Sequence, residues 1–503
     1  MRKILLTHFF LYAFLIHASS QVIVPTLREA THLNADRLII ADTISLPFEV
    51  SPEKRLSNED ILNKKEGLFV TGLPRFEFDP IRGFGVGGNV FLFQNNDKND
   101  PLFYYTPYRY SVNTEFFVFE NGRVRAAINL DIPYIFNTKW RVRADAVFWE
   151  DPNAQYWGIG RSSLDPLRFS DKSKGEYGPD RPFSRLADYE KNLSQAIPTS
   201  GAGYRTDTHY NQFIQRERLY NLLFERVELG GKLRIMFGYE ALFTAFEDYT
   251  GKIADEAFSF TTGEEVEAIN NPTLVNKQIN DGTWDRFNLS GFSDSYQFTS
   301  MLAAALIYDT RDLEPDPSKG VFLQYSHEYS APWLGSDFDF NKFMVQGQVI
   351  HTFHRWKDGR NRLTFAGLAA LGHIFGPNIN FIEMWDLSSQ AEAGGILVLG
   401  GGRSLRGYRE ARFLAPTVGL VNLEMRARLY DFTKLNQHFA LGLTPFYDFG
   451  SVWNGLGDIN LTKWRGAPGI GGRIAWNQST ILRLDYANSR EGGQFFFGFG
   501  HIF

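Results

Sequence analysis

The chain has 503 residues, with 46 phenylalanines, 46 glycines, no cysteine and a formal net charge of −5. Without cysteine there can be neither a disulfide framework nor a thiolate metal site. The nearly balanced charge gives no reason to expect nucleic acid as a partner. Aromatic residues together with glycine are typical of transmembrane barrels, in which aromatic girdles mark the membrane interfaces.

The first twenty residues have the pattern of a secretory signal peptide. Arg2 and Lys3 precede an apolar stretch at 4–16, and Ala18-Ser-Ser20 supplies the small residues of a cleavage site. The apolar stretch is shorter than the roughly 20 residues that span a bilayer. We therefore predict a signal peptide at 1–20, followed by a short periplasmic segment at 21–67. No later stretch is long and apolar enough for a spanning helix, so a membrane-spanning form must use strands.

From Leu68 onward, apolar and polar residues alternate with a period of two. Within 419–429, for example, Val421 and Leu423 alternate with Glu424 and Arg426. A face that is repeatedly charged, on strands of ten or more residues, fits a wall with lipid outside and a polar lumen inside. The sequence predicts an all-β fold, a transmembrane antiparallel barrel at 68–503 with about sixteen strands. These lie near 68–78, 84–94, 108–120, 123–133, 138–149, 211–226, 229–246, 294–309, 320–332, 338–354, 361–375, 410–430, 438–453, 464–477, 479–488 and 493–503.

An even strand count places both ends of the barrel on one side, the periplasm. The longest connections, 150–210, 247–293 and 376–409, all follow odd-numbered strands and therefore fall on the outer face. Most of the other connections are short, as this class of barrel requires. The connection at 95–107 is an exception that the pattern does not explain.

The last strand carries aromatic residues on one parity and ends on Phe503. Together with Phe499, this ending resembles the C-terminal signal by which bacteria recognise new outer-membrane barrels, although His501 departs from it. The simpler alternative is a strand that faces lipid.

Four motifs are spread over most of the chain. They are Tyr156-Trp-Gly-Ile-Gly160, Asp309-Thr-Arg-Asp312 at the eighth turn, Leu405-Arg-Gly-Tyr408 between the eleventh and twelfth strands, and Phe446-Tyr-Asp-Phe-Gly450 in the thirteenth strand. In these motifs the chain resembles the BamA/TamA superfamily of outer-membrane barrels, the bacterial surface antigen family. The resemblance implies that the sixth loop folds back into the barrel and presents its arginine to acidic residues of the wall.

The loop motif comprises Arg403, Leu405, Arg406, Gly407 and Tyr408. Its expected partners on the wall are Glu424 and Asp448, which share the lumen parity of adjacent strands. Arginine is a planar, permanently charged fork suited to carboxylates. We therefore predict that Arg406 bridges Glu424, Asp448 or both; the alternative is that it caps a surface loop. The resemblance also implies roles for Phe446 and Gly450 on the wall and for Asp309, Arg311 and Asp312 in the turn.

The segment at 21–67 is too short for the periplasmic POTRA domains that assembly members of the family carry. The resemblance thus implies a POTRA-less member of the bacterial outer membrane that assists assembly, insertion or translocation of proteins or lipids. The expected partners are outer-membrane lipids, including lipopolysaccharide, and periplasmic or outer-membrane assembly proteins, with no cofactor and no metal.

Two other function classes stay open. In the first, the barrel is a gated channel for small solutes with the sixth loop as plug, and lumen charges such as Arg141, Arg143 and Arg234 set its selectivity. In the second it is an outer-membrane enzyme, but no Ser–His or Asp–His arrangement emerges from the sequence, so we expect no catalysis.

Overall fold

The computed structural model describes residues 45–503, apart from 51–54, 57–60, 62–63, 80–82, 175–176, 202, 313–315, 357–360, 386–397, 435–436 and 477–479. The predicted signal peptide lies outside the described residues. None of the helices in this described part is long and apolar enough to cross a membrane.

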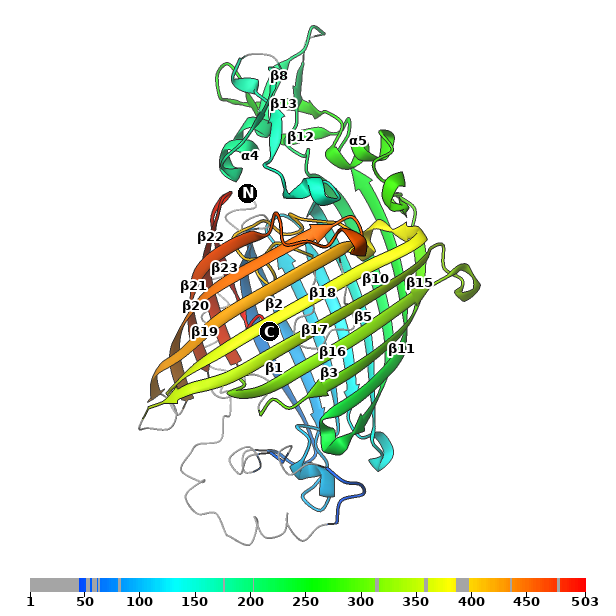
Figure 1. The fold of residues 1–503 in the computed structure, drawn as a ribbon, viewed down its shortest axis with the longest axis vertical. Helices are drawn as coiled ribbons and strands as arrows, with labels where there is room; N and C mark the ends of the chain where they lie inside the picture. The colour runs from blue at the N-terminus through cyan, green and yellow to red at the C-terminus, as the bar shows by residue number, and fades with distance from the viewer. Residues whose placement is uncertain are drawn as a thin grey trace.

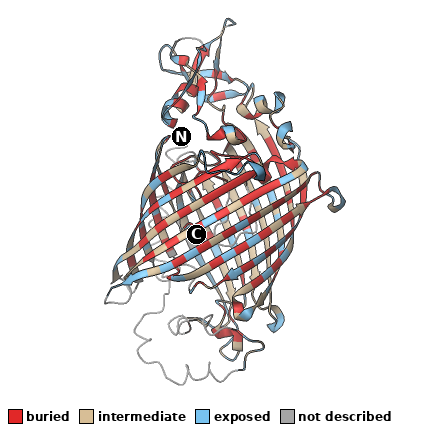
Figure 2. Ribbon diagram, in the orientation of Figure 1, coloured by how far each residue is buried: buried red, intermediate tan, exposed pale blue. Residues whose placement is uncertain are grey.

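Sixteen long strands, each antiparallel to the next in the chain, form the wall of a barrel (Figure 1). Buried and exposed residues alternate along them, as expected of a wall between two environments (Figure 2). The predicted all-β fold is therefore confirmed. The wall strands are β1 (Leu68–Asp79), β2 (Gly83–Gln94), β3 (Tyr110–Phe119), β4 (Val124–Ile132), β5 (Trp140–Gln155), β10 (Gln212–Glu228), β11 (Leu233–Asp248), β15 (Gln297–Asp309), β16 (Lys319–Ser330), β17 (Asp339–Arg355), β18 (Arg362–Asn380), β19 (Thr417–Lys434), β20 (Gln437–Trp453), β21 (Arg465–Trp476), β22 (Thr480–Ser489) and β23 (Gly492–Phe499).

Each predicted strand has a counterpart, and four of them need correction. The fifth and the eleventh, predicted to end at 149 and 375, continue to Gln155 and Asn380. The twelfth strand, predicted at 410–430, begins only at Thr417, because 410–416 belongs to the loop inside the barrel. The last strand, predicted at 493–503, ends at Phe499. Ile502 and Phe503 are buried in the main core instead of continuing along the wall. Alternation of apolar residues cannot distinguish a wall strand from a tail that turns into the lumen.

The two ends of the barrel differ in their connections. The loop end carries the long connections 156–211, 249–296 and 381–416, and the turn end carries shorter ones together with both chain ends of the wall. At the loop end, two long connections fold into a cap above the barrel (Figure 1). The cap contains β6 (Arg168–Ser170), β7 (Asp180–Pro182), α4 (Leu186–Ser194), β8 (Gln195–Pro198), β9 (Tyr204–Thr206), β12 (Ile253–Ser259), β13 (Glu265–Asn270), α5 (Leu274–Asn280) and the short helices η5 (Arg161–Leu164), η6 (Lys172–Lys174) and η8 (Asp285–Phe287).

In the cap, β8, β9, β12 and β13 close into a small barrel of their own. Its centre is filled by alanines, because only small side chains fit between four short strands. Sequence patterning predicted long loops here and missed this unit. The remaining elements are β14 (Leu289–Ser290), which pairs in parallel with β18, and the short helices η4 (Ile135–Asn137), η7 (Leu229–Gly231), η9 (Pro332–Leu334), η10 (Phe381–Met384) and η11 (Leu456–Asp458).

The connection at 95–107, unexplained by the sequence, forms a knob at the turn end. The short helix η3 (Pro101–Tyr104) packs Phe103 and Tyr104 against Ile61. Lys64 donates hydrogen bonds from Nζ to the carbonyl oxygens of Phe103 (2.5 Å) and Thr106 (2.7 Å). The connection is therefore long because it holds the segment that precedes β1.

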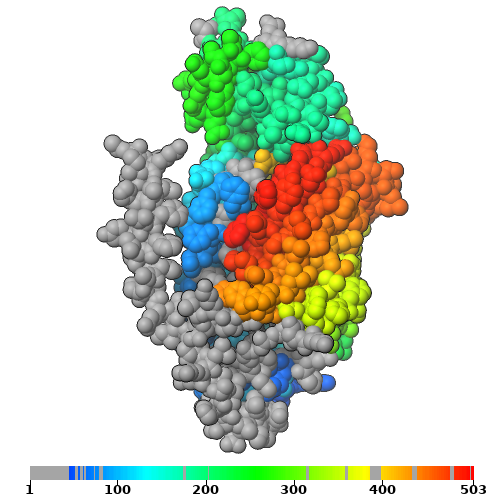
Figure 3. All heavy atoms as spheres, turned by 90° about the vertical axis from the view of Figure 1, so that its left-hand side faces the viewer, coloured from blue at the N-terminus to red at the C-terminus, as the bar shows by residue number. Residues whose placement is uncertain are grey.

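The two edge strands of the sheet, β1 and β23, lie side by side but are joined by no hydrogen-bonded ladder among the described residues. β1 pairs only with β2, and β23 only with β22. Figure 3 shows the first and last parts of the wall next to each other. We call this junction the seam.

The main hydrophobic core lies inside the lumen instead of between layers, and it extends from the loop end to Ile502 and Phe503 of the C-terminal tail. Aromatic rings from two wall strands and two connections meet there: Phe213, Phe246, Trp284, Phe292 and Phe381 pack with centroid separations of 4.6–6.1 Å. We call these five residues the aromatic plug. Together with the sixth loop, they close the barrel toward the cap.

Candidate functional site

The sixth loop, between β18 and β19, passes through the lumen from Val398 to Ala415, and most of its residues are buried. The path of the loop requires a glycine at one of its own positions and another on the wall that faces it. Gly400 has φ of 115°, and an added Cβ would lie 2.1 Å from the carbonyl oxygen of Arg409. A Cβ on Gly450 of the wall would lie 2.4 Å from Leu399. The glycine of the Phe-x-Asp-x-Gly motif thus makes room for the loop.

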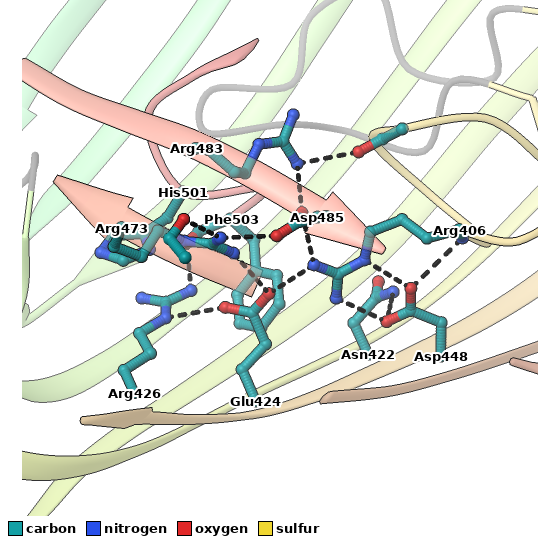
Figure 4. A network of polar contacts seen from close by, with 12 residues as sticks. Arg406, Asn422, Glu424, Arg426, Asp448, Arg473, Arg483, Asp485, His501 and Phe503 are labelled. Carbon is teal, nitrogen blue, oxygen red and sulfur yellow. Dashed lines mark hydrogen bonds and ion pairs between the residues drawn. The ribbon is translucent and has the colours of Figure 1, made fainter. Parts of the chain in front are cut away.

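Arg406 is the buried centre of the loop and is fully shielded from solvent. Its guanidinium forms a fork on Asp448, with Nε 2.6 Å from Oδ2 and Nη2 2.9 Å from Oδ1. Nη1 lies 2.9 Å from Glu424 and 3.0 Å from Asp485 (Figure 4). The structure therefore brings Arg406 to both wall carboxylates that the sequence pointed to, and adds a third. We call these four residues the Arg406 cluster.

Asp485 is a partner of Arg406 that the sequence did not predict. It lies on β22, where Ile481, Asp485 and Ala487 are all buried and share the parity that faces the lumen. The sequence did contain a signal for Asp485, because it is a carboxylate on the lumen parity of a strand near the loop. None of the four motifs includes this residue. Through Asp485, the loop is tied to the strand next to the last one.

Three carboxylates around one guanidinium would repel each other without further positive charge. Three arginines of the wall supply it (Figure 4). Arg473 lies 2.5 Å from Asp485, Arg426 lies 2.8 Å from Glu424, and Arg483 lies 3.4 Å from Asp485. Buried charges are retained only when they are paired in this way.

Neutral groups complete the surroundings of Arg406. The guanidinium carbon lies 3.3 Å from the centre of the Phe446 ring, a cation–π contact that is strong when desolvated. Asn422 donates from Nδ2 to Asp448 and to the carbonyl oxygen of Ser404, both at 2.8 Å. The ring of Phe446 thus covers the cluster, while Asn422 fixes the loop backbone.

The remaining residues of the loop motif have different surroundings. Leu405 is buried in the main core. Tyr408 is also buried and packs edge-on against Phe413; burial raises the pKa of its hydroxyl, which stays protonated. Gly407 has φ of 91° and lies close to Ala467 of the wall. Arg403 is exposed and takes no part in the Arg406 cluster.

A second set of contacts joins the loop to the cap. Ile159 pairs with Leu414 in a parallel bridge, and Trp157 donates its indole N–H to the carbonyl oxygen of Glu410 at 3.2 Å. Arg412 is buried and lies 2.8 Å from Glu491. Glu491 belongs to the turn between β22 and β23. The Tyr156–Gly160 motif is therefore a docking strip for the sixth loop.

The turn motif closes the connection between β15 and β16 at the turn end. Asp309 receives the fork of Arg311, with both nitrogens at 3.0 Å. Asp312 accepts from the backbone N–H of Ser318 at 2.8 Å. These three residues shape the turn and lie apart from the Arg406 cluster. Asp316 in the same connection lies 3.4 Å from His501, which belongs to the C-terminal tail.

The chain beyond β23 turns into the lumen. Arg426 donates from Nη2 to the carbonyl oxygen of Phe503 at 2.9 Å, and its guanidinium lies 4.9 Å from the Phe503 ring. Because Arg426 also pairs with Glu424, this tail (residues 500–503) is joined to the Arg406 cluster (Figure 4). Whether Phe499 and Phe503 act as an assembly signal stays a prediction; in the folded barrel Phe503 does not face lipid.

The arrangement can bind a loop in place, hold part of the wall rigid and close the lumen. Among the described residues, the charged groups of the Arg406 cluster are paired and shielded from solvent, so they offer no nucleophile or acid to a substrate. Its chemistry is that of a structural latch.

Comparison with known proteins gives a family for more than half of the chain. Residues 192–503 match the model of the Omp85 superfamily domain, and residues 46–109 match a domain of unknown function, DUF5982. The second match covers the segment before β1, the first hairpin and the knob. No curated protein matches the chain.

Several solved structures are similar over most of the chain. The BamA structure from Haemophilus ducreyi lacking POTRA domains 1–3 has 10% identity and a TM-score of 0.47, covering 87% of this chain and 70% of that one. CdiB from Escherichia coli has 10% identity and a TM-score of 0.47, covering 85% and 62%. CdiB from Acinetobacter baumannii has 10% identity and a TM-score of 0.42, covering 86% and 60%. The chain thus spans less than two thirds of the length of either CdiB.

Proposed function

This chain belongs to the Omp85 superfamily, and from that premise we propose that it is an outer-membrane barrel that assists the assembly, insertion or translocation of proteins or lipids. The observation that carries the proposal is the seam. β1 and β23 are neighbours without a hydrogen-bonded ladder among the described residues. Unpaired strand edges are templates for an incoming strand.

The Arg406 cluster supports this role by making one side of the seam rigid. Its carboxylates come from β19, β20 and β22, so the loop fastens three strands of the last part of the wall to one guanidinium. The first hairpin, β1–β2, has no contact with the cluster among the residues described. We therefore infer that opening moves the β1 side away from a fixed β22–β23 side.

A disulfide across the seam tests the proposal, and the chain has no cysteine that would interfere. One cysteine replaces Val70 on β1, and a second is scanned over positions 495–497 on β23, keeping the pair that crosslinks on oxidation. The control joins β1 to β2 through cysteines at Val70 and Leu92, which are direct partners in the ladder. Both variants are reconstituted in liposomes, and insertion of an unfolded client barrel is measured.

We expect the oxidised seam variant to lose insertion activity and to regain it when the disulfide is reduced. The oxidised β1–β2 control should keep its activity, because that ladder stays closed in the proposed movement. Full activity with the seam locked would overturn the proposal.

We further propose that the barrel works with partners at the turn end and in contact with outer-membrane lipids, including lipopolysaccharide. The knob supports this, because it presents a folded surface where a periplasmic protein can reach it. Mild crosslinking in native outer membranes, followed by purification and mass spectrometry, tests it. POTRA-bearing proteins, chaperones or unfolded barrels among the products would support it, and a barrel recovered alone would contradict it.

We propose no catalytic activity, since the latch offers no reactive group. A gated channel is the second candidate, and it rests on the aromatic plug that closes the lumen. Its proposed selectivity charges, however, are engaged in ion pairs: Arg141 with Asp131 at 2.7 Å and Arg143 with Glu225 at 3.3 Å. We therefore favour the assembly role.

A further inference from the structure

The cap contains a pocket that is separate from the seam and from the Arg406 cluster. Its volume is about 520 Å³, within the range of small-molecule sites. It opens at the loop end, between the β6–β7 hairpin, the chain around Asp207 and helix α5. The lining residues are Arg168, Phe169, Ser170, Tyr177, Asp180, Asp207, Tyr210, Asn271, Pro272 and Lys277.

One wall of the pocket is built on a buried ion pair. Lys172 is fully buried and lies 2.8 Å from Asp207, which is itself only 2% exposed. Asp207 also accepts hydrogen bonds from the Tyr177 hydroxyl at 2.7 Å and from Asn271 at 3.3 Å. A buried pair is costly to desolvate, so it is retained where it fixes a geometry. Here it holds Tyr177 and Asn271 at the pocket surface.

Aromatic rings form the floor. Phe169 and Tyr210 pack edge-on at a centroid distance of 4.8 Å, and Tyr177 approaches Phe169 from the side. Burial and the charge of Asp207 raise the pKa values of Tyr177 and Tyr210, so both hydroxyls remain protonated. The floor therefore combines apolar ring faces with the Tyr210 hydroxyl, which can donate or accept, and the Tyr177 hydroxyl, which donates to Asp207.

One cation of the pocket, Lys277, forms no ion pair among the described residues, although the charge of nearby Asp207 acts on it. Arg168 is paired with Asp180 at 3.0 Å. Lys277, in contrast, places Nζ over the Tyr210 ring, 4.6 Å from its centre, and 5.9 Å from that of Phe169. It has no ion pair or side-chain hydrogen bond in the part of the chain that the structure describes. Burial lowers the pKa of Lys277, and a bound anion would restore it.

The charge and the aromatic floor of the pocket indicate the chemical class of its ligand. One free ammonium matches one negative charge, whereas a polyphosphate would require several cations. Ring faces beside hydroxyl, amide and carboxylate groups suit a pyranose, whose axial C–H groups form an apolar face and whose hydroxyl groups lie along its edge. We propose that this pocket binds an acidic sugar, a pyranose that carries one carboxylate, with Lys277 on the carboxylate and the aromatic floor against the sugar ring.

The experiment uses the whole chain in detergent micelles and isothermal titration calorimetry. Sodium glucuronate and an oligogalacturonate are the probes, and glucose is the neutral comparison. Lys277→Met removes the charge but keeps an unbranched stem on the rings, and Lys277→Arg keeps the charge. Lys191→Met, an exposed lysine on α4 outside the pocket, is the matched control.

We expect the acidic sugars to bind more tightly than glucose. Lys277→Met should weaken the binding of the acidic sugars about tenfold or more, since a charge-assisted hydrogen bond is lost. Lys277→Arg and Lys191→Met should bind within a few-fold of the unmodified chain. Circular dichroism and heat-modifiable migration on gels check that every variant is folded.

The sugar could come from the saccharide of the same membrane or from outside it. Titration with delipidated lipopolysaccharide saccharide, beside the free uronates, distinguishes the two sources, and binding of either supports the proposal. It is overturned if Lys277→Met binds as well as the unmodified chain, if glucose binds as tightly as glucuronate, or if a glutamate-rich peptide binds and no acidic sugar does.

Discussion

Arg406 shows how one residue can hold a long loop inside a barrel. A guanidinium offers five donors in a rigid plane, and Arg406 directs them to carboxylates from three different strands. Lysine could not reproduce this arrangement, since its ammonium is a point charge without a planar fork. The ring of Phe446 then covers the face of the plane that no carboxylate reaches.

Replacing Arg406 with methionine should destabilise the folded barrel strongly. The change keeps an unbranched apolar stem but leaves Glu424, Asp448 and Asp485 without their shared cation. Breaking a buried pair in this way costs about 3–5 kcal/mol. Urea unfolding of the refolded barrel in detergent would measure the loss. Arg403→Met, at an exposed position of the same loop, should change stability little; a similar loss in both variants would contradict the latch.

Asp485 is predicted to contribute to the same latch although no motif contains it. Asp485→Asn should weaken the barrel by about 1–3 kcal/mol, because three guanidiniums lose a shared charge. Its effect should not add to that of Arg406→Met, since residues that share one network couple by about 0.5–3 kcal/mol. A double-mutant cycle measures the coupling, and strict additivity would show that the two residues act independently.

At the scale of elements, the helix η3 and the segment before β1 depend on one lysine. Burial lowers the pKa of Lys64 to about 7, below its ordinary value of 10.5. The amine also donates to two carbonyl oxygens of the 101–106 connection. The knob is thus a place where the charge state of a single side chain affects the docking of a segment.

The stability of the knob should therefore depend on pH. Between pH 7 and 10.5 the undocked segment binds more protons than the docked one, so docking becomes more stable as pH rises. The gain is complete above about pH 10.5, declines as pH falls between about 10.5 and 7, and is absent below about pH 7. From pH 7 to 9 we expect up to about 2 kcal/mol. Hydrogen exchange at 61–66 and 101–106, corrected for intrinsic rates, measures it. Lys64→Met should abolish the pH dependence, and an equal dependence in that variant would contradict the assignment.

Two segments that the sequence predicts to be wall strands have a different structure. Residues 410–416 alternate like a strand yet lie in the sixth loop, where Leu414 pairs with Ile159 of the strip at 156–160. The tail after β23 keeps the aromatic parity of a strand but binds Arg426 in the lumen. Periodicity reports which residues are suited to burial on one side; it does not report which surface buries them.

At the scale of the whole molecule, apolar groups fill the lumen below the cap, and ion pairs line part of the wall toward the turn end. The aromatic plug and the sixth loop occupy the part below the cap. Ion pairs such as Arg141–Asp131 line the wall toward the turn end. A barrel closed at one end is suited to movement at its seam more than to steady passage of solutes through its axis.

The closed lumen predicts no steady conductance in planar bilayers. Replacing 400–408 with a short glycine–serine linker should produce open events, because it removes both the Arg406 contact and much of the filling. Single-channel recording provides the measurement, with Arg403→Met as a control that stays closed. Steady conductance of the unmodified chain would contradict the filled lumen and favour the channel.

The sequence by itself determined the wall: a period of two with charged lumen positions, sixteen strands, the side of the long loops, and Arg406 with Glu424 and Asp448 as its partners. These follow from short-range alternation and from local motifs, which a linear chain records directly. Only the tertiary structure decided the third carboxylate at Asp485, the inward tail, the knob, the cap with its pocket and the unpaired seam. Each of these arises where segments far apart in the chain meet, and the energy of such a contact depends on burial and geometry that no local pattern contains.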